Sequence, residues 1–152
     1  MRMNRKFCVC TVLALFFCGA VLSVAMRSTA QAADWPGFRG PGAQGHADVK
    51  KLPLKWSNTQ GIGWQTKLPG SGWSSPVLVD GKLYLTGAEI EENKAMKLAV
   101  YSFDAKSGKN LWRRELFVIR GKTPRVHKKN SHASPTPTIE DGRLYVHFGT
   151  HG

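Results

Sequence analysis

Four histidines near the end of the chain are the residues whose type points most directly to chemistry. His127 and His132 fall in one polar segment, and His147 and His151 lie four positions apart. Imidazole nitrogens bind transition metals and exchange protons near neutral pH, so these four are weak candidates for a metal or catalytic site. On a continuous strand, His147 and His151 would lie about 13 Å apart, too far to share a metal. They converge only if the strand ends near Gly149, and the alternative is ordinary hydrogen bonding within loops.

A basic stretch lies just before these histidines and carries the densest charge of the chain. It begins at Arg113 and Arg114 and continues through a polar segment. Guanidinium and ammonium groups bind phosphate, sulfate and carboxylate, so this segment is a candidate anion site. The alternative is a solvated loop between two strands. The candidate anion-binding residues are Arg120, Lys122, Arg125, Lys128 and Lys129.

The first 32 residues predict a secretory signal peptide. Three basic residues precede an uncharged run from 7 to 26, and small residues at 30 and 32 provide a cleavage site after Ala32. We therefore expect export, to the periplasm or outside the cell. The rival is an uncleaved membrane anchor, because 20 apolar residues are enough to span a bilayer. Lipidation at Cys18 is a third alternative.

Cysteine and charge usage narrow the function classes of the mature chain. All three cysteines lie in the leader, so the mature chain has neither a disulfide framework nor a thiolate metal site. Without the four basic residues of the leader, 18 basic residues remain against 10 acidic ones. Behind a signal peptide, this excess favours an anionic partner or simple solubility over nucleic acid. We expect envelope proteins or an anionic polymer as partners, and membrane contact only if the leader is uncleaved.

The residues from 63 onward predict strands and turns, and no helical periodicity runs through the mature chain. Short strands are predicted at 63–66, 76–79, 82–86, 98–103, 110–117 and 143–148, with an exposed loop or short helix at 88–97. Alternation in the fourth strand places Leu98 and Val100 on one face and Tyr101 and Phe103 on the other. Before them, the glycine- and proline-rich residues 34–45 predict an ordered loop. The sequence therefore predicts an all-β chain.

Part of this pattern is repeated. The segment from Ser75 to Leu85 returns from Ser134, with an insertion of two residues before the second Asp-Gly turn. The two turns, Asp80-Gly81 and Asp141-Gly142, are 61 positions apart, and Trp64 and Trp112 are 48 apart. Periods near ~40–50 residues, with four short strands each, are typical of propeller blades.

The segment from Ser102 to Trp112 resembles the tryptophan-docking motif of quinoprotein-type (PQQ-like) propellers, Ala-x-Asp-x-x-Thr-Gly-x-x-x-Trp. Asp104, Gly108 and Trp112 match, and Ser107 replaces the threonine. Asp104 can accept amide hydrogens of the turn, Gly108 can adopt a positive φ, and Trp112 can stack between blades. These three residues are expected to serve architecture rather than chemistry.

The resemblance implies an incomplete β-propeller. Residues 1–32 form the signal peptide, 33–62 an irregular segment, and 63–152 a partial repeat domain of about one and a half blades. Since seven or eight blades close a propeller of this family, we expect a truncated chain. The leading hypothesis is a non-catalytic binding or assembly scaffold, similar in repeat type to the propeller of the outer-membrane protein assembly machinery. One alternative is the N-terminal part of a quinone-dependent dehydrogenase, with PQQ and calcium as cofactors. Another is a carbohydrate- or polyanion-binding module. No catalytic or cofactor-binding residue is assigned.

Overall fold

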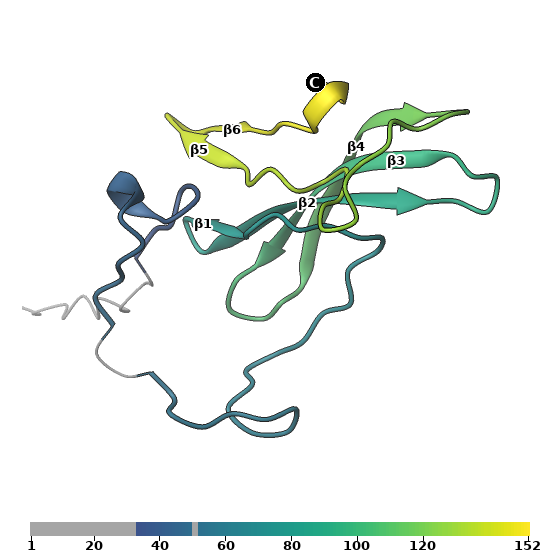
Figure 1. The fold of residues 1–152 in the computed structure, drawn as a ribbon. Helices are drawn as coiled ribbons and strands as arrows, with labels where there is room; N and C mark the ends of the chain where they lie inside the picture. Colours follow the sequence, from purple (N-terminus) through teal and green to yellow (C-terminus); the bar gives the residue numbers. More distant parts are fainter. Residues whose placement is uncertain (1–32, 50–51) are drawn as a thin grey trace, which may run out of the picture.

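An up-and-down antiparallel sheet forms the centre of the structure (Figure 1). The computed structural model describes residues 33–49 and 52–152, so the expected signal peptide and its alternatives lie outside the described residues. The sheet has the order β1 (Val77–Val79), β2 (Lys82–Ile90), β3 (Met96–Asp104) and β4 (Asn110–Ile119), and a separate hairpin joins β5 (Thr138–Glu140) to β6 (Arg143–Tyr145). The described residues also form two 3-10 turns, η1 (Pro41–Ala43) and η2 (Gly149–His151), and none of their helices could cross a bilayer. The predicted all-β class is confirmed.

Strand β3 is the buried centre of the sheet. Leu98 and Val100 belong to one hydrophobic cluster, and Tyr101 and Phe103 belong to another on the opposite face. The predicted alternation is therefore confirmed. Because β3 is apolar on both faces, both faces of the sheet must be covered by other segments.

The two Asp-Gly sequences form matching hairpin turns. Asp80 and Gly81 have φ values of 51° and 69°, and Asp141 and Gly142 have 48° and 70°. Positive φ at both central positions is the geometry of a type I′ turn, whose twist suits two-residue hairpins. Each sequence therefore produces the hairpin that it predicts.

The strands of the two hairpins also pair in the same register. Val77 pairs with Tyr84 in the first hairpin, and Thr138 pairs with Tyr145 in the second, 61 positions later. The two other residue pairs of β1 and β2 recur with the same offset. The structural counterpart of Pro76 is thus Pro137. The expected two-residue insertion does not lie within the repeated hairpin, because matching register requires strands of equal length.

Three strand predictions are wrong in their extent. β2 continues to Ile90, because residues 87–90 pair with the start of β3, and the predicted loop at 88–97 shrinks to a tight turn. Residues 63–66 form no strand, since no neighbouring strand pairs with them within the described ranges. The predicted strand 143–148 ends at Tyr145, and Phe148 turns into the core.

The second hairpin and its flanking segments cover one face of the sheet (Figure 1). Ala133 and Phe148 are buried in the cluster that contains Leu98, and Ala133 O accepts the amide hydrogens of Trp73 and Ser74 at 3.1 and 3.2 Å. The loop that contains Trp35 and Pro36 forms hydrogen bonds with both hairpins. Trp35 exchanges two backbone hydrogen bonds with Leu78 of β1, and the amide of Ile139 in β5 donates to Pro36 O at 2.8 Å.

Leu98→Ala should destabilise the fold strongly. Leu98 is fully buried between the sheet and the second hairpin. Truncation leaves a cavity that this packing cannot fill, and such changes cost about 2–5 kcal/mol. Urea unfolding measures the loss. As a control, Ile90→Ala at a side chain that is 75% exposed should change the free energy of unfolding by less than about 0.5 kcal/mol. Equal losses would contradict the assigned core.

Candidate functional site

The turn between β3 and β4, residues 104–109, holds the indole of Trp64 from a segment about forty residues earlier. A Cβ added to Gly108 would lie 2.2 Å from the Trp64 ring, so the indole packs directly on the glycine backbone. The indole Nε1–H donates to Ala105 O at 2.9 Å, and the Thr66 hydroxyl donates to Gly108 O at 2.7 Å. The arrangement needs glycine at 108 both for space and for its φ of 70°.

Asp104 stabilises this turn by accepting hydrogen bonds from its other residues. Its Oδ1 accepts hydrogen bonds from the amide and the hydroxyl of Ser107, at 2.7 and 2.6 Å. These bonds favour the ionised carboxylate, and they lower the pKa of Asp104. The Gly108 amide donates to Asp104 O at 2.8 Å and closes the loop. Asp104 and Gly108, singled out in the sequence, thus shape the surface that receives a tryptophan.

Trp112, the third residue of the motif, occupies a different environment. It lies on β4 opposite Ser102, and its ring centroid is 5.9 Å from that of Tyr84. Its exposure of 39% is close to the 36% of Trp64, so the two tryptophans differ in their neighbours and not in their burial. The docked tryptophan is Trp64, whose place in the sequence repeat corresponds to that of Trp112. Sequence reasoning used Trp64 only as a marker of the repeat. Its spacing of 48 residues from Trp112 was the available signal.

A shallow apolar hollow lies beside the docked indole. It measures about 270 Å³ and opens between the segment 64–76 and the face of the sheet opposite the second hairpin. The residues along it include Trp64, Leu68, Leu83, Leu85 and Phe103. This face is therefore covered by one irregular segment, and its packing is less complete than that of the face under the second hairpin.

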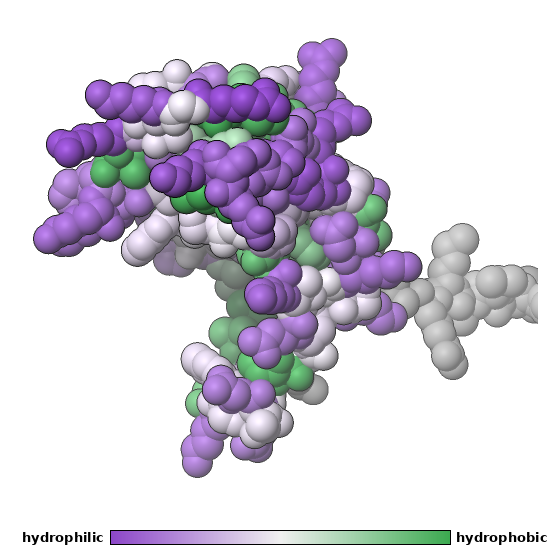
Figure 2. Space-filling view, turned by 90° about the vertical axis from the view of Figure 1, so that its right-hand side faces the viewer, coloured by the Kyte–Doolittle hydropathy of each residue, from purple (hydrophilic) through white to green (hydrophobic). Residues whose placement is uncertain are grey.

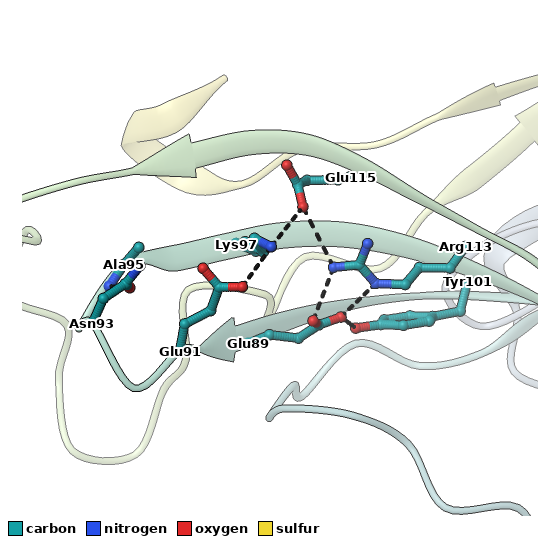
Figure 3. A network of polar contacts seen from close by, with 8 residues as sticks. All are labelled: Glu89, Glu91, Asn93, Ala95, Lys97, Tyr101, Arg113 and Glu115. Carbon is teal, nitrogen blue, oxygen red and sulfur yellow. Dashed lines mark hydrogen bonds and ion pairs between the residues drawn. The ribbon is translucent and has the colours of Figure 1, made fainter.

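A polar network ties three strands together on the same face (Figure 3). Arg113 on β4 donates from Nε and Nη2 to the two carboxylate oxygens of Glu89 on β2, at 2.7 and 2.9 Å. The Tyr101 hydroxyl on β3 also donates to Glu89 and lies 3.3 Å from Pro69 O. Gly87 leaves room for the tyrosine ring, which a Cβ there would approach to 2.7 Å.

The charges of this network stabilise one another. The hydrogen bonds from Arg113 lower the pKa of Glu89 against the opposing effect of its burial. Burial, with the bond to Glu89, raises the pKa of Tyr101 well above its ordinary value. Tyr101 thus stays protonated and acts as a donor. Sequence reasoning missed this network because it ended β2 at residue 86 and left Glu89 in a loop.

Lys97 and Glu115 extend the network toward the end of the sheet (Figure 3). Lys97 Nζ lies 2.5 Å from Glu91 and 3.5 Å from Glu115, and Arg113 Nη2 lies 3.7 Å from Glu115. The hydrogen bond to Glu91 raises the pKa of Lys97. Two cations and three carboxylates therefore alternate across β2, β3, β4 and the adjoining turn.

The structure brings together two of the four candidate histidines. The rings of His132 and His151 have centroids 5.7 Å apart, and His151 Nε2 is buried without a hydrogen-bond partner. Burial and the neighbouring His151 lower the pKa of His132. His127 and His147 instead accept backbone amide hydrogens from Lys129 and Gly149. Residues 33–49 and 52–152 contain no group of three or more His, Cys, Asp or Glu that could hold a metal.

The five candidate anion-binding residues are all exposed on the segment after β4. None of them belongs to an ion pair among the described residues. Arg113, which begins the basic stretch, differs from them because Glu89 neutralises it. Arg114, beside it, is exposed and forms no ion pair with a described residue, so it stays available to a ligand together with the residues from Arg120 onward.

Comparison with known families and curated proteins finds no match. No family model matches the sequence, and no curated protein is similar to it. The resemblance of the docking motif therefore supports a proposal and does not assign a family.

Gly108→Ala should cost more than Gly142→Ala. Both glycines have a φ of 70°, so both changes introduce similar backbone strain of about 1–2 kcal/mol. A Cβ at Gly142 meets open space, whereas at Gly108 it meets the Trp64 ring. We expect an additional loss of about 1–3 kcal/mol for Gly108→Ala in urea unfolding, from displacement of the docked indole. Equal losses would show that the docking contributes nothing to stability.

Glu89→Gln should destabilise the fold in a pH-dependent way. The pKa of Glu89 is lowered in the folded state, so the ionised carboxylate stabilises the fold above its ordinary value of 4.5. This contribution disappears as the pH falls through the lowered pKa. Glu89→Gln should cost on the order of 1 kcal/mol at about pH 7 and progressively less below about pH 4. Urea unfolding at about pH 7 and below about pH 4 checks this. Glu92→Gln in the exposed turn is the control, and it should cost less at about pH 7 because Glu92 forms no ion pair with a described residue.

Proposed function

We propose that this chain belongs to an exported protein built from quinoprotein-type propeller repeats, and that it acts as a non-catalytic binding or assembly scaffold. The observation that carries the proposal is the docking of Trp64 on the turn 104–109. A tryptophan from one repeat lies on the Asp-x-x-Ser-Gly turn of the next repeat. Such contacts connect units that would be unstable alone.

The repeated hairpin supports the same proposal. The second hairpin has the register of the first, and its flanking residues bury one face of the four-stranded sheet. In a propeller, consecutive blades cover each other face to face in this way. The described residues then correspond to one blade and the first part of another.

The scaffold role is supported by the structural part that the motif residues take in the fold. Asp104 and Gly108 are occupied in shaping a turn, and Trp64 packs on it. Trp112, the counterpart of Trp64, lies beside Tyr84 on the outer strand β4 and is 39% exposed, about as much as Trp64. We infer that this ring contacts a partner that offers a similar surface. The quinone-dependent alternative continues to rest on the sequence resemblance alone.

Photo-cross-linking in the exporting cell tests the proposal. A photoreactive phenylalanine analogue placed at Trp112 should give a discrete adduct with an envelope protein, because the ring lies at the inferred contact. The same analogue at Tyr145, 50% exposed on the second hairpin, serves as the control and should give less. Mass spectrometry of the adducts identifies the partner.

Two outcomes would contradict the scaffold. Equal cross-linking from Trp112 and Tyr145 would remove the inferred contact. A saturable change in the absorbance of PQQ on titration with the mature protein and calcium, accompanied by dye-linked alcohol oxidation, would favour the dehydrogenase instead.

A further inference from the structure

The end of the sheet that carries the β2–β3 turn collects positive charge that the fold leaves unpaired. The segment after β4 has five basic residues, and no acidic residue occurs between 116 and 139. The structure adds a sixth cation from a distant part of the sequence, Lys94 of the β2–β3 turn. Lys94 and Arg120 lie together at this end of the sheet, and four more basic residues follow Arg120 along the exposed segment. We call this set the cationic end. It consists of Lys94, Arg120, Lys122, Arg125, Lys128 and Lys129.

Lys94 and Arg120 border one surface hollow. The hollow measures about 540 Å³ and is lined by Asn93, Lys94, Ala95, Arg120 and Gly121. Neither cation forms an ion pair with a described residue. Two unpaired cations at a concave surface concentrate the positive potential where an anionic group can enter.

The turn holds Lys94 in an unusual conformation. Its φ is 63°, in the left-handed region where glycine or asparagine is normally favoured. The Glu91 amide donates to Ala95 O and the Lys94 amide donates to Glu91 O, both at 2.9 Å. The Asn93 side chain also accepts the Ala95 amide hydrogen at 2.8 Å, and these bonds fix the turn. The lysine is thus presented at the edge of the hollow by a defined backbone.

Two acidic side chains near the hollow could reduce its attraction for an anion. Glu91 is engaged by Lys97 at 2.5 Å. Glu92 is exposed in the same turn and forms no ion pair with the described residues. It should therefore weaken, but not cancel, the attraction for an anion.

We propose that the cationic end binds an acidic polysaccharide bearing sulfate or carboxylate groups. Figure 2 shows this side of the molecule, with hydrophilic side chains over most of its upper part. Residues 118–144 contain no Phe, Trp or Tyr for stacking on nucleic-acid bases. Val126 on the segment after β4 and Ile90 at the end of β2 are large exposed apolar side chains here, and two such side chains are too little for insertion into a membrane. Arginine and lysine spaced along an exposed segment suit a polymer with repeated anionic groups. This proposal does not depend on the propeller assignment.

Binding of fluorescent dextran sulfate to the mature chain tests it. We expect saturable binding that weakens with rising salt, and no binding of neutral dextran. Lys94→Gln with Arg120→Gln should weaken the affinity about tenfold, because two ionic contacts are lost. Glu92→Gln should strengthen it about two- to threefold by removing a repelling charge.

The matched control removes two charges at the other end of the sheet. Lys106→Gln with Lys109→Gln changes exposed lysines of the β3–β4 turn and should leave the affinity within about twofold. All variants should keep the urea midpoint of the unmodified chain, since the altered side chains are exposed. If both double variants weakened the affinity equally, binding would depend only on the net charge of the chain, and the proposal would be overturned. Tighter binding of a double-stranded DNA oligonucleotide than of dextran sulfate at equal salt would also overturn it.

Discussion

The burial of β3 on both faces is the constraint on which the rest of the structure depends. A single antiparallel sheet has two surfaces, and β3 presents Leu98 and Val100 to one and Tyr101 and Phe103 to the other. Neither surface can be left in water without a large loss of hydrophobic stabilisation. The segments before and after the sheet must therefore pack against it. This need explains why the chain returns to the sheet from both directions.

The two faces are covered by different means. The second hairpin and the segment before it bury one face through side-chain packing around Ala133 and Phe148. On the opposite face, the irregular segment 64–76 is attached by individual contacts. Trp64 packs on Gly108, and the Tyr101 hydroxyl lies beside Pro69 O. Between these points, Glu89 and Arg113 link β2 to β4 across Tyr101. Directional contacts thus compensate for packing that is less complete.

The docking of Trp64 and the cationic end lie on different parts of the sheet. The faces of the sheet carry the docking and core contacts, where glycine, tryptophan and buried aliphatic side chains are required by shape. The end of the sheet carries loops that pack little, so their side chains are free to provide charge. A change in the cationic end should therefore leave the docking of Trp64 intact. Conversely, the docking turn lies at the opposite end of β3 and contributes no residue to the cationic end.

The sequence by itself determined the all-β class, both Asp-Gly hairpins, the alternating faces of β3 and the turn built on Asp104 and Gly108. Each of these follows from local rules, namely side-chain alternation and the φ preferences of short turns. Only the tertiary structure decided the length of β2, the irregular path of residues 63–66, and the meetings of Trp64 with Gly108, Glu89 with Arg113, and His132 with His151. The reason is physical. Strand ends depend on the neighbour available for pairing, and contacts between distant residues depend on how two faces of one sheet are covered.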